Sequence, residues 1–178
     1  MGFFIPKDRG GGCFPEIYLA EGDTTFSDNP AVEPLLTRGN AVIKADTPKS
    51  LTILVVEDNE SVRKKICERL TSQTGFEVIC EAVNGLEGVR HAEELQPDIV
   101  VLDISMPVFG GIEAAARIRR VAPKARIVFL SQHKLSGIAE AALASGGHAY
   151  VVKSAASADL IPAIQAAVQG KRFVSKLE

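Results

Sequence analysis

Polar side chains suited to metal and phosphoryl chemistry follow four separate hydrophobic runs of this chain. The runs are 51–56, 99–102, 127–130 and 149–152, and the residues that follow them are Glu57 with Asp58, Asp103, Ser131 and Lys153. Carboxylate oxygens are the ligands that a hard divalent cation prefers. A hydroxyl and an ammonium can bind phosphoryl oxygens. Together these residue types suit a site for a divalent cation and a phosphoryl group.

The four hydrophobic runs are typical of strands buried on both faces, and these strands would position the polar side chains that follow them. Strands are expected at about 51–57, 76–83, 98–102, 126–130 and 148–152, and helices at about 60–73, 86–95, 112–121, 135–145 and 158–169. Strands that alternate with helices predict an α/β fold, a doubly wound sheet of five parallel strands. Ligands of such sheets bind at the carboxyl ends of the strands, so the polar side chains should meet at one edge.

Asp103 is the central candidate for chemistry. An Asp after a strand is more often a turn or helix-capping residue. Here the sequence Ile-Ser-Met-Pro at 104–107 carries the chain away and leaves the carboxylate facing the cleft. A carboxylate in that position can attack phosphorus and form an aspartyl phosphate.

A cluster of carboxylates predicts a metal site. The Glu57-Asp58 pair would be a solvated turn in most proteins, but the first and third strands of a flavodoxin-like sheet are neighbours, which places the pair beside Asp103. Three nearby carboxylates repel one another and raise each other's pKa, unless a cation neutralises them. The oxygen ligands favour Mg²⁺, with the backbone carbonyl of Ser105 as a further ligand.

The remaining candidates are Lys153, Ser131 and Tyr150. Lys153 could be a surface lysine, but at a strand end in the same cleft it is expected to pair with Asp103 and later with a phosphoryl oxygen. Ser131 could cap a helix, and its position favours a hydrogen bond to the phosphoryl group. Tyr150 could simply pack in the core, or its ring could move together with Ser131, so that its hydroxyl leaves the surface.

These residues, in this order, resemble the receiver domain of two-component response regulators. Separations of 45, 28 and 22 residues connect Asp58, Asp103, Ser131 and Lys153, and the resemblance covers residues 50–172. The segment AYVVKSAASADLIPAIQAAVQGKRFVS (149–175) is most similar to receivers attached to helix-turn-helix transcription regulators. The family implies a flavodoxin-like (βα)5 fold, Mg²⁺, and phosphoryl transfer to Asp103 from a sensor histidine kinase or phosphotransfer protein.

The resemblance implies a signalling domain rather than an enzyme with a separate substrate. Such a domain catalyses its own phosphorylation and dephosphorylation, and phosphate on Asp103 then switches an output surface. That surface is expected at 135–145, 148–152 and 158–169, with Ser131 and Tyr150 as switch residues. A homodimer through this surface and an output in transcription regulation are further expectations; the helices at 60–73 and 158–169 form a competing dimer surface.

Other functions fit less well. A phosphatase of the haloacid-dehalogenase type requires a second Asp two residues after the nucleophile, where this chain has Ser105. A nucleotide-binding domain requires a glycine-rich loop after the first strand, which is absent from the sequence. A receiver that never carries phosphate is disfavoured by the intact set of residues. The chain departs from many receivers at Ser154, where proline is common, and at Gln132, where a small residue is common.

The composition of the chain indicates where its domain begins and ends and which classes of partner it lacks. Residues 1–49 contain five prolines and a Gly-Gly-Gly run without periodicity, which predicts an irregular or flexible extension. Residues 173–178 are expected to be a C-terminal tail or a truncated linker. The net charge of −2 argues against nucleic-acid binding by this segment. The sequence contains neither a long apolar run nor a secretory signal, which predicts a cytoplasmic protein without membrane contact.

Overall fold

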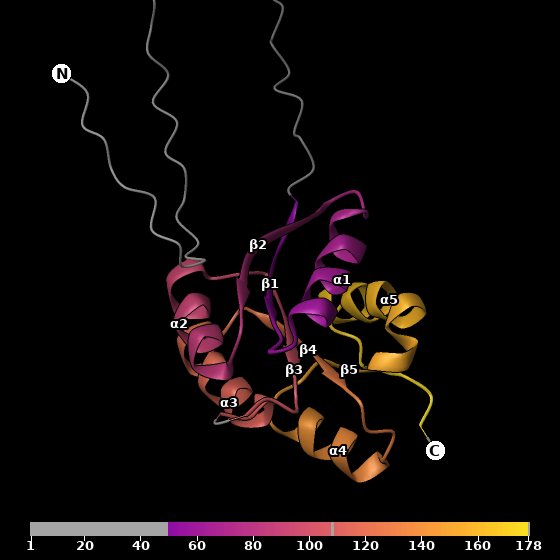
Figure 1. The fold of residues 1–178 in the computed structure, drawn as a ribbon. Helices are drawn as coiled ribbons and strands as arrows, with labels where there is room; N and C mark the ends of the chain where they lie inside the picture. Colours follow the sequence, from indigo (N-terminus) through magenta and orange to yellow (C-terminus); the bar gives the residue numbers. More distant parts are fainter. Residues whose placement is uncertain (1–49, 108, 178) are drawn as a thin grey trace, which may run out of the picture. The chain divides into compact units, whose positions relative to one another are not determined.

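A computed structural model describes residues 50–107 and 109–177 and contains one parallel sheet with helices on both faces (Figure 1). The strands are β1 Leu51–Val56, β2 Phe76–Ala82, β3 Ile99–Asp103, β4 Arg126–Ser131, β5 Ala149–Val152 and β6 Phe173–Val174. The helices are α1 Glu60–Thr71, α2 Gly85–Leu95, α3 Gly111–Val121, α4 Ser136–Ala144 and α5 Ala156–Val168, with a 3₁₀ turn, η1, at Lys153–Ala155. The strand order is β2-β1-β3-β4-β5-β6. The expected flavodoxin-like fold is confirmed, whereas the expected extension at 1–49 lies outside the described residues.

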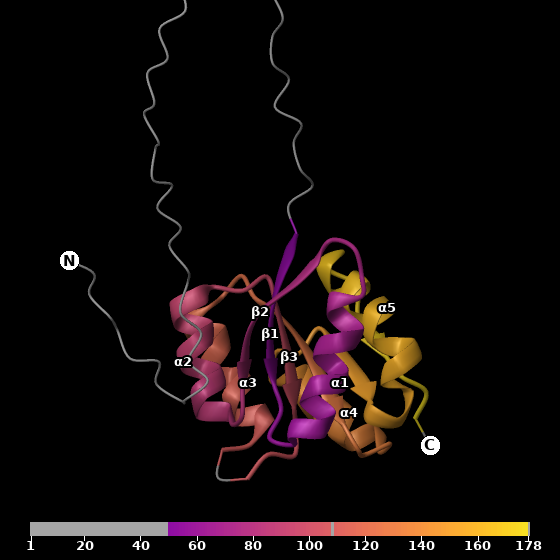
Figure 2. The same cartoon turned by 45° about the horizontal axis from the view of Figure 1, so that its top comes forward.

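Alternate residues of the buried strands build the two halves of the core. On one face Val55 of β1 belongs to a cluster with Ile66 of α1 and Leu160 of α5. The other face is covered by α2 and α3, as two views show (Figures 1 and 2). On that side Gly88 of α2 lies so close to Val56 that an added Cβ would be 2.9 Å from its side chain. Burial on both faces explains why the strands read as continuous apolar runs.

The C-terminal segment adds a sixth strand to the five that the sequence predicts. β6 pairs in parallel with β5. Just after it, the N–H of Ser175 donates to the carbonyl of Tyr150 at 2.9 Å, and its hydroxyl accepts a hydrogen bond from Val152 N–H at 3.2 Å. The Ser175 hydroxyl also donates to Asp159 of α5. Residues 173–175 therefore cover the edge of β5.

The boundaries of two elements bear on the site. Asp103 is the last residue of β3 instead of the first residue after it, and its strand position fixes its backbone more firmly than a loop would. The chain leaves β5 through η1, which begins at Lys153. No peptide bond of the described residues is cis, so the bond between Lys153 and Ser154 is trans. No helix within 50–107 and 109–177 has the length and apolar character required to cross a membrane.

Candidate functional site

The turn between β1 and α1 carries Glu57 and Asp58 to the carboxyl edge of the sheet. Glu57 is fully buried, and its N–H donates to the carbonyl of Ala82 at 3.1 Å, which extends the pairing of β1 with β2 by one residue. Asp58 is exposed. Asn59 then caps α1, because its side-chain oxygen accepts a hydrogen bond from Val62 N–H at 3.1 Å. The cap ends the turn after two acidic residues, so both carboxylates stay at the strand end.

Asp103 is 1% exposed at the end of β3. Its Oδ1 accepts a hydrogen bond from the N–H of Ser105 at 3.2 Å. The start of α3 packs against the backbone here: a side chain at Gly111 would overlap the carbonyl oxygen of Asp103. Glycine at this position lets the start of α3 return close to the end of β3. The Asp103 side chain lies beside the turn that carries Glu57 and Asp58.

Lys153 connects the carboxylates of two strands. Its ammonium nitrogen is 2.9 Å from Asp103 Oδ2 and 2.7 Å from Glu57 Oε2. It also donates a hydrogen bond to Glu57 Oε1 at 3.0 Å. Burial alone would lower the pKa of Lys153, but the hydrogen bonds to Glu57 and Asp103 outweigh burial and raise it. The ammonium is therefore charged at neutral pH and offsets part of the negative charge of the site.

Glu57, Asp58 and Asp103 can hold a metal ion. One carboxylate oxygen from each lies within 4.8 Å of the other two. Glu57 Oε2 is buried, and the ammonium of Lys153, at 2.7 Å, forms an ion pair with it. Burial raises the pKa of Glu57, and the charge of Asp103 adds to this, while the Lys153 hydrogen bond lowers it. A cation would relieve the repulsion among the three carboxylates, and the all-oxygen set fits a hard ion such as Mg²⁺.

Ser131 lies on β4, the neighbour of the strand that carries Asp103, and Tyr150 lies on β5, one strand further along the sheet. Ser131 ends β4, and its hydroxyl accepts a hydrogen bond from His133 N–H at 3.0 Å. Tyr150 is fully buried, and its hydroxyl donates to the carbonyl of His133 at 2.8 Å. Both side chains are thus bonded to one residue of the loop before α4. A Tyr150 hydroxyl at the surface before phosphorylation is the expectation from the sequence, whereas the structure has it inside.

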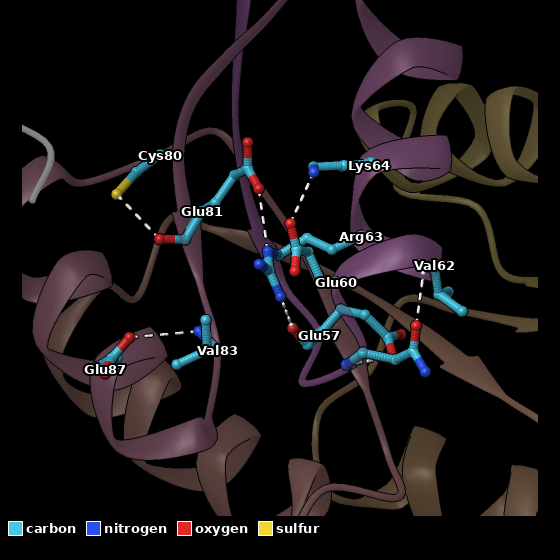
Figure 3. A network of polar contacts seen from close by, with 10 residues as sticks. Glu57, Glu60, Val62, Arg63, Lys64, Cys80, Glu81, Val83 and Glu87 are labelled. Carbon is cyan, nitrogen blue, oxygen red and sulfur yellow. Dashed lines mark hydrogen bonds and ion pairs between the residues drawn. The ribbon is translucent and has the colours of Figure 1, made fainter. Parts of the chain in front are cut away.

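Arg63 is a residue of the site that the sequence analysis did not single out. Its guanidinium donates to the backbone carbonyl of Glu57 at 2.9 Å. It also pairs with Glu81 of β2 at 3.0 Å (Figure 3). Arginines on helices are common at surfaces and extend their charged ends to solvent, so only the position of Arg63 in the first turn of the helix that follows Asp58 could have indicated this contact.

Comparisons with known proteins find one family model and several relatives that match this sequence. The family model described as the response regulator receiver domain matches residues 53–165. The transcriptional regulatory protein PdtaR of Mycobacterium tuberculosis is 38% identical over 136 residues, 75% of this chain. The chemotaxis protein CheY of Listeria monocytogenes is 34% identical over 119 residues, 67% of this chain and 99% of its own length.

A solved structure agrees with the described fold. The crystal structure of a LuxR-family two-component response regulator from Aurantimonas sp. SI85-9A1 has a TM-score of 0.67 and 36% identity, and the match covers 70% of this chain and 89% of that one. By contrast, this chain spans 64% of the length of PdtaR. The similarity to PdtaR therefore concerns a part of that protein.

Proposed function

Because the chain belongs to the response regulator receiver domain family, we propose that Asp103 accepts a phosphoryl group from a phosphohistidine of a partner protein. The observation that carries this proposal is the arrangement around Asp103. Its carboxylate lies 2.9 Å from a charged Lys153 and within 4.8 Å of the carboxylates of Glu57 and Asp58. A nucleophile, a fixed cation and a metal-binding pair are the parts that phosphoryl transfer needs.

The residues of this chain position the reacting groups. A carboxylate oxygen of Asp103 forms a bond to phosphorus while the bond from phosphorus to the donor histidine nitrogen breaks, and that nitrogen keeps the electron pair. Lys153 then transfers its contact from the Asp103 carboxylate to a phosphoryl oxygen, where it offsets developing charge. Ser131 turns its hydroxyl from His133 N–H towards another phosphoryl oxygen.

Mg²⁺ is the proposed cofactor. Glu57, Asp58 and Asp103 would hold it, with the carbonyl of Ser105 as a further oxygen ligand. When bound, the ion supplies positive charge that neutralises the phosphoryl oxygens during transfer. The three carboxylates, which each bring one oxygen within 4.8 Å of the other two, support this assignment.

The donor is a sensor histidine kinase or a phosphotransfer protein, and it must reach a carboxylate that is 1% exposed. A groove of about 690 Å³ lies between α1 and α5, and Lys153 is one of its lining residues. Ile66 and Leu160 form its apolar floor, and polar side chains such as Arg69 line its margin. An apolar floor with a polar margin suits a partner helix that carries the phosphohistidine into the site.

The proposed output surface is formed by α4, β5 and α5. Ser131 and Tyr150 both bind His133, so movement of Ser131 towards a phosphoryl group would shift the loop that precedes α4. Small residues of α4, such as Ala141, permit close approach of a second copy. Sedimentation with and without beryllofluoride, a phosphoryl mimic, tests for a homodimer; equal association of wild type and Tyr150→Phe would exclude Tyr150 from the switch.

The proposed domain is a cytoplasmic phosphoacceptor without a turnover substrate, and its net charge of −2 argues against direct binding of nucleic acid by this segment. Its self-catalysed reactions are uptake and hydrolytic loss of phosphate. Transcription regulation is the proposed output, by analogy with PdtaR and the LuxR-family structure. Transfer of labelled phosphate from a phosphorylated histidine phosphotransfer protein tests the function. We expect the protein to take up phosphate, and we expect chelation of Mg²⁺ to abolish this uptake. Absence of uptake both from such donors and from acetyl phosphate would refute the proposed function.

A further inference from the structure

Arg63, in the first turn of α1, contacts both ends of the acidic turn. Its backbone N–H donates to the carbonyl of Asn59 at 2.9 Å, and its guanidinium NH1 donates to the carbonyl of Glu57, also at 2.9 Å. Asp58 lies between these two carbonyls. One residue therefore holds both ends of the segment that supplies two of the three clustered carboxylates.

A second contact fixes the guanidinium itself. Its Nε donates to Glu81 Oε2 of β2 at 3.0 Å, as Figure 3 shows. The side chain of Arg63 is 12% exposed and that of Glu81 is 47% exposed, so the guanidinium is shielded from solvent while its carboxylate partner is not. The backbone ladder between β1 and β2 ends with the N–H of Glu57 on Ala82. At this end of the ladder Arg63 adds a side-chain connection, because it binds the Glu57 carbonyl after β1 and the Glu81 carboxylate of β2.

The acidic turn needs such a support, because the carboxylates of Glu57, Asp58 and Asp103 lie within 4.8 Å of one another and repel. Repulsion would drive the exposed Asp58 outwards if the turn were free to move. The planar guanidinium presents two N–H groups in a rigid geometry and binds the Glu57 carbonyl rather than the carboxylates. The ligand oxygens are thereby left for the cation.

We propose that Arg63 is a positioning residue that holds the Glu57–Asp58 turn ready for the cation. This inference rests on the proposed Mg²⁺-dependent function. Arg63 does not touch the reacting atoms, so its loss should raise the Mg²⁺ concentration required and leave the rate at saturating Mg²⁺ close to that of the wild type.

The test compares Arg63→Met with Lys64→Met. Lys64 is the next residue on α1 and pairs with Glu60 at 2.6 Å (Figure 3), so its variant loses the same charge near the site without touching the turn. Calorimetric titration of Arg63→Met should show Mg²⁺ affinity weakened on the order of 10-fold, as for loss of other groups that orient metal ligands. Lys64→Met should stay close to the wild type. The half-saturating Mg²⁺ concentration for phosphorylation by acetyl phosphate should rise by the same factor.

Hydrogen exchange of the metal-free protein gives a reading that does not depend on activity. The amides of Asp58 and Asn59 should exchange faster in Arg63→Met, while those of β3 and β4 keep their protection. If Arg63→Met does not fold, Arg63→Lys, which retains a donor for the Glu57 carbonyl, and Glu81→Gln, which weakens the second contact, should both show smaller losses of Mg²⁺ affinity.

Equal effects of Arg63→Met and Lys64→Met would overturn the inference, because charge alone would then explain them. A lower saturated rate with an unchanged Mg²⁺ requirement would also overturn it. If the wild type takes up no phosphate, the proposed function fails, while Mg²⁺ titration and hydrogen exchange still decide the role of Arg63.

Discussion

The ammonium of Lys153 lies 2.9 Å from Asp103 Oδ2, although the two residues come from β3 and from the turn after β5. The strand order places β4 between these strands, so the long lysine side chain spans the edge of the sheet. The same ammonium donates to Glu57 Oε1 at 3.0 Å. Lys153 therefore occupies, before any transfer, the region where phosphoryl charge is proposed to develop.

Lys153→Met should slow phosphorylation by acetyl phosphate on the order of 100-fold, the cost of removing one group that stabilises transition-state charge. The matched control is Lys171→Met, which removes an exposed lysine after α5. Initial rates at saturating Mg²⁺, measured by intact mass, provide the comparison. Similar rates for the two variants would show that Lys153 has no part in the transfer.

Asp58→Ala should weaken Mg²⁺ binding by at least about 10-fold, since loss of an outer group already costs that much. The metal-free protein should melt no lower than the wild type, because the substitution removes one of three mutually repelling carboxylates. Glu60→Ala, which removes an exposed acid at the start of α1, is the control. Mg²⁺ titration and thermal melting give the two readings; unchanged affinity would remove Asp58 from the metal site.

The strands and the residues at their ends could be predicted because burial on both faces leaves a strong pattern. Each of β1, β3, β4 and β5 appears as an apolar run that stops at a polar residue. Asp103 and Lys153 could be placed at one edge because parallel strands end on the same side. The sequence thus predicts which strand ends share an edge, since that depends on topology alone.

Other features depend on contacts that leave no periodic signal. β6 has only two residues, Phe173 and Val174, and the backbone N–H and the hydroxyl of Ser175 support its pairing with β5. The second partner of Lys153, Glu57, follows from side-chain reach rather than strand order. The inward position of Tyr150 likewise depends on one backbone carbonyl of the loop before α4.

Ser157→Trp should obstruct the groove between α1 and α5, which Ser157 lines. Transfer from a phosphorylated partner protein should slow, while uptake from acetyl phosphate, a small molecule, should remain close to that of the wild type. Ser136→Trp places the same exposed ring in the first turn of α4 and serves as the control. The measurement is the ratio of the rate of transfer from the partner protein to the rate of uptake from acetyl phosphate. If both donors slow equally, the substitution has damaged the site and the groove is not a docking surface.

His148 should make the protein less stable in acid. Burial, together with the charge of Arg126, lowers the pKa of His148 below 6.5. Its Nδ1 accepts a hydrogen bond from Ile127 N–H at 3.1 Å, which requires an unprotonated nitrogen. The unfolded chain therefore takes up a proton more readily than the folded one, and stability is lost as the pH falls below the unfolded pKa and through the folded one.

Thermal melting between about pH 7.5 and about pH 5.5 tests this prediction across the titration range of histidine. On going to the lower pH, the melting temperature of the wild type should fall further than that of His148→Asn. His133→Asn, which replaces an exposed ring, should behave like the wild type. An equal loss in the wild type and His148→Asn would exclude His148 as the cause.

The most direct test identifies the residue that carries phosphate. The protein is incubated with acetyl phosphate and Mg²⁺, and borohydride reduction then converts an aspartyl phosphate to homoserine, which peptide mass spectrometry locates. We expect a single phosphoryl adduct on the wild type, homoserine at position 103, and no adduct on Asp103→Asn, which keeps the shape but lacks the nucleophile. An adduct of equal yield on Asp103→Asn, or homoserine at another position, would contradict the assignment of Asp103 as the phosphoacceptor.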